Sequence, residues 1–195
     1  MSDNPFPFLN SNSAEVALVE GDDKHTYSEV NDRIKLFSSG ILGKRDDLNE
    51  ERIAFFLPAS LDYVTAMHGV WRAGGIAVPL NVASAVSELD HYLTCANVTR
   101  LIAGTEYHDS LKELCKSLEI ELLSVGDLLA EEPRELPLID PQRRAMMLFT
   151  SGTTNKPKGV VSTHKTIYAQ IKTLINAWEW SEKDVIPLFL PLHHI

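Results

Sequence analysis

The sequence predicts an α/β fold in which a mostly parallel sheet is flanked by helices. Short, unbroken apolar runs, which suit strands covered on both faces, alternate along the chain with apolar residues at helical spacing. Such alternation favours parallel strands joined by helices. In addition, 44% of the 195 residues are hydrophobic, which is enough to fill the core of one domain.

The alternation begins in the first half of the chain. Thr26 and Glu29 have the spacing of a capping box, and the apolar residues behind them predict a helix over 27–39. The apolar run 53–57 is stopped by a proline and predicts a buried strand. The serine that opens 60–72 can cap a second helix, and two glycines after that range can end it.

The middle of the chain predicts three more strands, over 76–80, 101–102 and 119–124. Two apolar stripes at helical spacing separate them, Leu89, Tyr92, Leu93 and Ala96, and then Leu111, Leu114, Cys115 and Leu118. Prolines and acidic residues break the pattern over 126–142, so we expect a surface connection there.

The last part of the chain predicts a strand, a loop, a strand and a helix. The apolar segments 145–149 and 160–161 lie on either side of a loop rich in Ser, Thr, Gly and Lys. An apolar stripe over 167–178 predicts a helix, and the run 185–190 predicts a further strand.

The loop between those two strands has the composition of an anion-binding site. Hydroxyl groups and free backbone N–H groups donate to phosphate oxygens, glycines let the backbone approach a ligand, and lysines supply positive charge. The P-loop pattern does not fit, because Pro157 stands where its second glycine would be, counted from Gly152. Pro157 also disfavours helical geometry at Lys156. We therefore expect a strand-loop-strand hairpin that binds a polyphosphate.

The segment Thr150-Ser-Gly-Thr-Thr-Asn-Lys-Pro-Lys-Gly159 resembles the signature loop of the adenylate-forming superfamily. This superfamily of AMP-binding enzymes includes acyl-CoA synthetases, luciferases and the adenylation domains of peptide synthetases. Three further stretches agree with it in order and kind, 26–30, 71–81 and 190–194. The paired histidines of the last stretch resemble the malonyl-CoA and fatty acyl-CoA synthetase branches. The resemblance spans most of the chain and implies the N-terminal part of the large domain of this family.

The resemblance implies that the loop binds ATP. The expected nucleotide-binding residues are Thr150, Ser151, Gly152, Thr153, Thr154, Asn155, Lys156, Lys158 and Gly159. Thr153 and Thr154 are also expected to lie near a Mg²⁺ ion. Lys158 is expected to be catalytic, because charge builds on the departing pyrophosphate and a fixed cation stabilises it.

Two loop positions leave alternatives open. Asn155 stands where the family usually has glycine. Asparagine tolerates the left-handed backbone region, so either the loop keeps its shape or the extra atoms crowd the phosphate. Lys156 is at a variable family position, where a solvated lysine is as good an interpretation as a phosphate ligand.

His194 aligns with the single histidine of the family motif, which implies a catalytic role beside the substrate carboxylate. His193 is expected to be a pocket wall, and His164 is expected to pack or cap near the helix that it begins. The three tryptophans, Trp71, Trp178 and Trp180, are interpreted as core residues. Cys95 and Cys115 are interpreted as buried, reduced thiols, since they lack a metal-binding spacing.

The implied reaction is the activation of a small-molecule carboxylic acid with ATP, Mg²⁺ and coenzyme A. The carboxylate would attack the α-phosphorus of ATP, pyrophosphate would leave, and the thiol of coenzyme A would displace AMP to give a thioester. Two alternatives stay open. One is an acyl-AMP ligase that delivers the acyl group to a carrier protein, and the other is a non-catalytic nucleotide-binding module of the same fold.

Residues 1–195 are expected to be only part of an AMP-binding domain. The sequence stops at Ile195, inside the Leu-Pro-Leu-His-His motif, and it lacks the family's adenine-binding segment, acidic Mg²⁺ ligand and C-terminal lysine. We therefore expect this chain by itself to be inactive, and to self-associate through apolar surface that is left uncovered.

Charge and hydropathy restrict the partners. The net charge of −9 disfavours binding to nucleic acid and to anionic membranes. No apolar run approaches the roughly 20 residues of a membrane span, and the N-terminus lacks the features of a secretion signal, so stable membrane insertion is not expected. The expected location is the cytoplasm.

Overall fold

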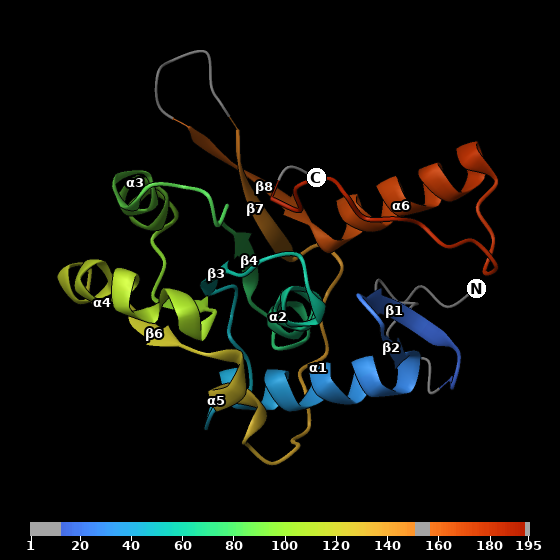
Figure 1. The fold of residues 1–195 in the computed structure, drawn as a ribbon, viewed down its shortest axis with the longest axis horizontal. Helices are drawn as coiled ribbons and strands as arrows, with labels where there is room; N and C mark the ends of the chain where they lie inside the picture. Colours follow the sequence, from blue (N-terminus) through green and yellow to red (C-terminus); the bar gives the residue numbers. More distant parts are fainter. Residues whose placement is uncertain (1–12, 151–156, 194–195) are drawn as a thin grey trace.

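The computed structural model describes residues 13–150 and 157–193. Its centre is a six-stranded sheet in the order β6-β5-β3-β4-β7-β8 (Figure 1). The strands are β3 Arg52–Phe56, β4 Ile76–Pro79, β5 Arg100–Ala103, β6 Glu121–Leu123, β7 Arg144–Thr150 and β8 Lys158–Thr163. All neighbouring pairs are parallel except β7 and β8, which are antiparallel. The predicted fold class and the predicted hairpin are therefore confirmed.

Helices cover both faces of the sheet (Figure 1). Helices α1 Tyr27–Leu42, α2 Leu61–Arg72 and α5 Val125–Leu129 pack on one apolar cluster, and α3 Val86–Ala96 and α4 His108–Ser117 pack on another. A short 3₁₀ helix, Thr105–Tyr107, precedes α4. The predicted helix starts are confirmed, since Thr26 and Ser60 accept hydrogen bonds from the first turns of α1 and α2. Helix α1 continues three residues beyond the predicted end at residue 39.

The sheet is doubly wound, and this determines where its helices lie. β3 and β5 are adjacent, but the helix that follows β3 covers one face and the helix that follows β5 covers the other. In such sheets the loops at the carboxyl ends of the strands diverge at this point, which opens a crevice. The helix α6 His164–Trp178 follows β8 and begins beside α2, where His164 contacts Trp71.

A small N-terminal hairpin was not predicted. β1 Val16–Glu20 and β2 Asp23–Thr26 form a separate two-stranded antiparallel sheet, joined through Gly21 at a φ of 60°. Ala17 of this hairpin packs against Val30 and Ile34 of α1. The glycine between two short alternating segments was the signal for this turn.

The connection over 126–142 is not wholly irregular, because the short helix α5 begins immediately before it. Ser124 accepts a hydrogen bond from the N–H of Asp127, and the carboxylate of Asp127 accepts one from the N–H of Ser124. Val125 and Leu128 of this helix are buried. α5 lies against α1, where a Cβ at Gly40 would meet the carbonyl oxygen of Leu128 at 2.1 Å. The prolines of the connection lie beyond α5, so they do not prevent it.

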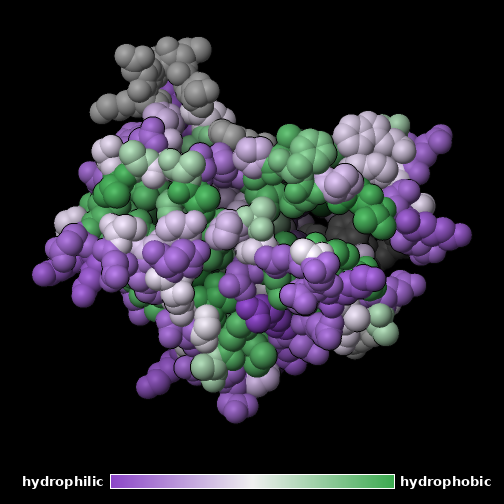
Figure 2. All heavy atoms as spheres, in the orientation of Figure 1, coloured by the Kyte–Doolittle hydropathy of each residue, from purple (hydrophilic) through white to green (hydrophobic). Residues whose placement is uncertain are grey.

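The predicted strand over 185–190 is wrong. This run forms no strand, and its side chains are exposed, with Val185 at 88% and Phe189 at 81%. Hydrophobic surface is visible in Figure 2 in the region where α6 and the segment after it lie in Figure 1. An apolar run forms a strand only where another strand edge pairs with it, and no described strand does so.

Three interpretations of single side chains were also partly wrong. Trp71 is buried as expected, whereas Trp178 on α6 is 62% exposed and Trp180 is half-buried. Cys115 is buried, but Cys95 is exposed. Both exposed residues, Cys95 and Trp178, lie near the C-terminal ends of their helices.

An ion pair fixes the amino ends of the strands. The Arg143 guanidinium donates to both carboxylate oxygens of Asp47, at 2.6 and 2.8 Å, and to the carbonyl oxygen of Gly74. These hydrogen bonds hold the pKa of Asp47 below its usual range. One side chain thus joins the loop before β3, the turn before β4 and the start of β7.

Candidate functional site

The predicted phosphate-binding loop connects the ends of β7 and β8. The register of β4 and β7 consists of the single pair Ala77 and Met146, whereas β7 and β8 remain paired as far as Thr150 and Lys158. Residues 147–150 and 158–161 therefore form a two-stranded projection, here called the hairpin arm (Figure 1). The arm leaves the sheet at the carboxyl edge of the parallel strands, where ligands of α/β sheets commonly bind.

The hairpin arm contains three of the predicted nucleotide-binding residues. Thr150 and Lys158 are paired and exposed at its end. The Thr150 hydroxyl therefore lies where the loop begins, and the Lys158 side chain lies where the loop ends. Gly159 is paired with Phe149. The other six predicted loop residues, Ser151, Gly152, Thr153, Thr154, Asn155 and Lys156, lie outside the described residues, as does His194.

Gly159 has a packing role beside any role in ligand binding. A Cβ at this position would lie 2.9 Å from Sδ and 3.2 Å from Cγ of Met147 on the facing strand. These contacts are too short unless the Met147 side chain shifts. The absence of a Cβ at Gly159 therefore leaves room for the Met147 thioether. The predicted contact of Gly159 with a phosphate stays a prediction.

Helix α3 touches both strands of the hairpin arm. The Tyr92 ring packs on the Phe149 ring, with 4.7 Å between centroids and 40° between planes. His91 Nε2 lies 3.2 Å from the carbonyl oxygen of Pro157, immediately before β8. The sequence did not single out His91, because a lone histidine in a helix without a motif carries no recognisable signal. Tyr92 was predicted only as part of an apolar stripe.

The C-terminal histidine motif lies near the same edge of the sheet. The Tyr63 hydroxyl of α2 donates to the carbonyl oxygen of Leu192 at 2.9 Å, and burial raises the pKa of Tyr63 so that the hydroxyl keeps its proton. His193 lines a pocket of about 70 Å³ together with Pro79, Leu80, Asn81, Ser84, Tyr92 and Phe149. Residues 79–81, Phe149 beside the signature loop and His193, which are far apart in sequence, thus meet around this pocket.

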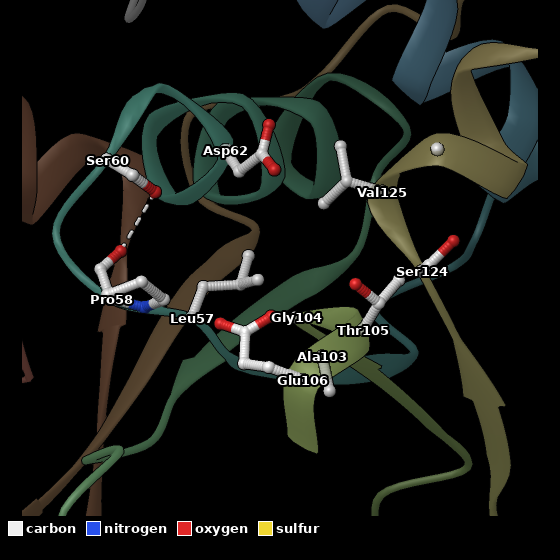
Figure 3. Close-up of a pocket in the computed structure, with 11 residues that line it drawn as sticks. Leu57, Pro58, Ser60, Asp62, Ala103, Gly104, Thr105, Glu106, Ser124 and Val125 are labelled. Carbon is white, nitrogen blue, oxygen red and sulfur yellow. Dashed lines mark hydrogen bonds between the residues drawn. The ribbon is translucent and has the colours of Figure 1, made fainter. Parts of the chain in front are cut away.

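A larger pocket, of about 230 Å³, lies at the switch between β3 and β5 (Figure 3). The first turn of α2 and the loops after β5 and β6 form its walls. Two carboxylates, Asp62 and Glu106, line it, and its described lining contains neither lysine nor arginine. Because carboxylates repel phosphates, we favour the smaller pocket and the hairpin arm over this crevice as the nucleotide-binding region.

The root of the hairpin arm is apolar and buried. The indole Nε1 of Trp71 donates to the carbonyl oxygen of Ala145 at 2.7 Å, and the His164 ring meets the Trp71 ring edge-on at 5.9 Å. Burial lowers the pKa of His164 to about 4, and the positive charge of Arg143 contributes to the shift. His164 is therefore neutral and packed at pH 7, as predicted, and the N-cap of α6 is Thr163 instead.

No described group of three His, Cys, Asp or Glu side chains could hold a metal ion. Within the described ranges, no helix is long and apolar enough to cross a membrane.

Comparison with known proteins identifies the family. Residues 9–195 match the model of the AMP-binding enzyme family. The chain is 35% identical over 193 residues to a mitochondrial malonate–CoA ligase of Homo sapiens, a match that covers 92% of this chain and 33% of the relative. It is 32% identical over 201 residues to a CoA ligase of Gibberella moniliformis, with 96% of this chain and 34% of the relative covered. The chain thus spans about a third of the length of these relatives.

Solved structures show the same fold. ATP-bound MatB of Rhodopseudomonas palustris superposes with a TM-score of 0.85 at 23% identity, over 100% of this chain and 41% of that one. The McyG A-PCP structure complexed with phenylalanyl-adenylate gives a TM-score of 0.75 at 22% identity, over 83% and 27%. With the hairpin arm, the histidine motif and the family match in agreement, this chain belongs to the family of AMP-binding enzymes.

Proposed function

We propose that the whole protein that contains this chain is an acid–thiol ligase, which uses ATP to join a small carboxylic acid to coenzyme A. One observation carries the proposal. The hairpin arm holds both ends of the signature loop beside the pocket that His193 lines. CoA ligases among the relatives and an ATP-bound structure among the structural neighbours support ATP and coenzyme A as the co-substrates.

Lys158 is the residue of the described arm best suited to the first step. When a carboxylate attacks the α-phosphorus, the bond to the bridging oxygen breaks and negative charge grows on pyrophosphate. A cation fixed at the end of a paired strand stabilises this charge more in the transition state than in the ground state. The Thr150 hydroxyl, on the partner strand, is a hydrogen-bond donor to the same phosphates.

The loop residues also suit magnesium. Mg²⁺ prefers oxygen ligands and commonly binds substrate phosphates together with few protein groups. Thr153 and Thr154 would supply hydroxyl oxygens beside the phosphates of ATP. Bound there, the ion would neutralise part of the charge on the phosphates.

The substrate class is proposed from the relatives. Malonate–CoA ligases of Homo sapiens and Xenopus laevis share 35% and 36% identity with this chain. We therefore propose a short dicarboxylic acid, with malonate as the first acid to test. The acyl group would lie near the small pocket, where His193, Asn81 and Ser84 offer polar atoms.

The test is a product analysis of the full-length protein. Purified enzyme is incubated with ATP, Mg²⁺, coenzyme A and one acid at a time from a panel of malonate, succinate, acetate and hexadecanoate. We expect acid-dependent release of pyrophosphate and AMP, together with a thioester that mass spectrometry identifies. Formation of ADP and phosphate in place of AMP and pyrophosphate would contradict the proposed chemistry.

Two controls separate the alternative functions. An acyl-AMP ligase would release pyrophosphate with an acid but would form no thioester with coenzyme A. A non-catalytic module would bind ATP and release no pyrophosphate with any acid. The isolated 195-residue chain is expected to form no thioester, because the family's adenine-binding segment and C-terminal lysine are not in its sequence.

A further inference from the structure

The hairpin arm needs support from outside the sheet. Beyond Met146, β7 has no paired residue on β4, so the arm is a two-stranded ribbon. Such a ribbon is marginally stable by itself in water. Met147 is buried, and Leu148 and Phe149 pack in part against the core clusters, but Thr150, Lys158, Val160 and Val161 are exposed, so the end of the arm nearest the loop depends most on outside support.

Helix α3 supplies that support through two consecutive residues. Tyr92 packs its ring on Phe149 of β7, and His91 places Nε2 3.2 Å from the carbonyl oxygen of Pro157. The Tyr92 contact therefore lies on the strand before the loop, and the His91 contact lies on the residue immediately after the loop. The helix itself is held firmly, since Leu89, Leu93 and Ala96 on its inner face are buried against the sheet.

The geometry assigns His91 a donor role. The Pro157 carbonyl oxygen can only accept a hydrogen bond, so His91 must carry its proton on Nε2. This carbonyl belongs to the same planar peptide unit as the Lys158 N–H. A hydrogen bond that fixes the carbonyl direction therefore also fixes the direction in which Lys158 begins β8.

We propose that His91 and Tyr92 form a clamp on the hairpin arm, and that His91 is a positioning residue for adenylation through the Pro157–Lys158 peptide. The positioning role of His91 in adenylation rests on the proposed ligase function. The clamp itself is a statement about the free protein, and it can be tested without substrates.

The first experiment measures opening of the arm by limited trypsin digestion of the full-length protein without ligands. Trypsin can cut after Lys158, whereas the Lys156 bond is protected by the proline that follows it. Mass spectrometry monitors cleavage after Lys158. We expect this cleavage to be several-fold faster in His91→Ala than in wild type, because local opening of the arm governs the access of trypsin. His91→Gln, which keeps a side-chain N–H donor, should restore a rate near that of wild type.

The second experiment measures ATP kinetics of the same variants by acid-dependent ATP–pyrophosphate exchange. We expect His91→Ala to lower kcat/KM for ATP about two- to tenfold, as for the loss of one hydrogen bond, and to leave KM for the acid unchanged. Cys95→Ala is the matched control, since Cys95 is exposed one helical turn further along α3. It should match wild type in both experiments.

The outcomes are distinguishable. Equal cleavage rates in wild type and His91→Ala would overturn the clamp. Faster cleavage with unchanged ATP kinetics in an active enzyme would overturn the positioning role. A wild-type protein without ligase activity would refute the proposed function and with it the positioning role, and the cleavage rates alone would then decide the clamp.

Discussion

Lys158 is the described side chain on which the proposed chemistry depends most. Removal of its charge in Lys158→Ala should lower kcat/KM for ATP about 10- to 100-fold, because a charge-assisted contact contributes about 1.5–3 kcal/mol. Pyrophosphate exchange measures this effect. Lys165→Ala is the control, since Lys165 is an exposed lysine in the first turn of α6. Equal losses in the two variants would show that general charge, and not the position of Lys158, matters.

His164 makes the stability of the fold dependent on pH. Its folded-state pKa of about 4 lies below the value of about 6.5 expected when the chain is unfolded. Between these values the unfolded state binds more protons, so the free energy of unfolding falls as pH falls from about 6.5 to 4. The contribution is full above pH 6.5 and is lost at about 1.4 kcal/mol per pH unit.

Urea unfolding followed by circular dichroism at pH 6.5, 5.5 and 4.5 tests this expectation. His164→Leu should show a shallower decline with pH than wild type. The comparison isolates His164, because His68, whose pKa burial lowers to about 3, titrates in both proteins. Parallel declines in the two proteins would exclude His164 as the cause.

At the scale of elements, the turn between α2 and β4 depends on a glycine. Gly74 has a φ of 83°, and a Cβ there would lie 2.2 Å from Oδ1 of Asp47 and 2.8 Å from Nη2 of Arg143. Gly74→Ala should therefore both strain the backbone and disturb the ion pair. Gly21→Ala is the matched control, since Gly21 has a φ of 60° with nothing within 4 Å of its Cβ position.

We expect Gly21→Ala to destabilise the protein by about 1–2 kcal/mol, the cost of a left-handed residue. Gly74→Ala should cost about 1–3 kcal/mol more, through the disturbed hydrogen bonds of Asp47. Chemical denaturation measures both values. Equal losses of unfolding free energy in Gly21→Ala and Gly74→Ala would mean that Asp47 and Arg143 move aside without a free-energy cost.

Local signals predicted most of the elements. The capping box of Thr26 and Glu29, the apolar runs 53–57 and 76–80 and the glycine pair are readable because each depends on neighbours within a few residues. The hairpin was readable because the loop composition and Pro157 exclude a helix start. Features that depend on distant partners were missed. The contact of His91 with Pro157 joins residues 66 positions apart, and the fate of 185–190 depends on strand pairing, which sequence pattern alone does not show.

At the scale of the whole molecule, the exposed apolar residues of the C-terminal segment should make the isolated chain associate. Val185, Ile186, Leu188, Phe189 and Leu190 are all exposed in one short stretch. Burial of such surface between copies gains about 25 cal/mol per Å². Sedimentation of the 195-residue chain should show a mass that rises with concentration.

The double variant Val185→Ser, Phe189→Ser should shift this chain toward the monomer. Leu138→Ser is the control, because Leu138 is 99% exposed but lies alone in the connection before β7. It should associate as wild type does. A wild-type chain that stays monomeric at the highest concentration would contradict the expectation.

The hydrogen bond between Trp71 and Ala145 gives the molecule an optical reporter. The Trp71 indole is buried at the point where the arm leaves the sheet, whereas Trp178 and Trp180 lie at the far end of α6 and are accessible to water. In a chain with Trp178→Phe and Trp180→Phe, emission would come from one indole whose N–H is bonded to β7. Movement of the arm's root in the 195-residue chain would then appear as a shift in the wavelength of Trp71 emission, without any added label.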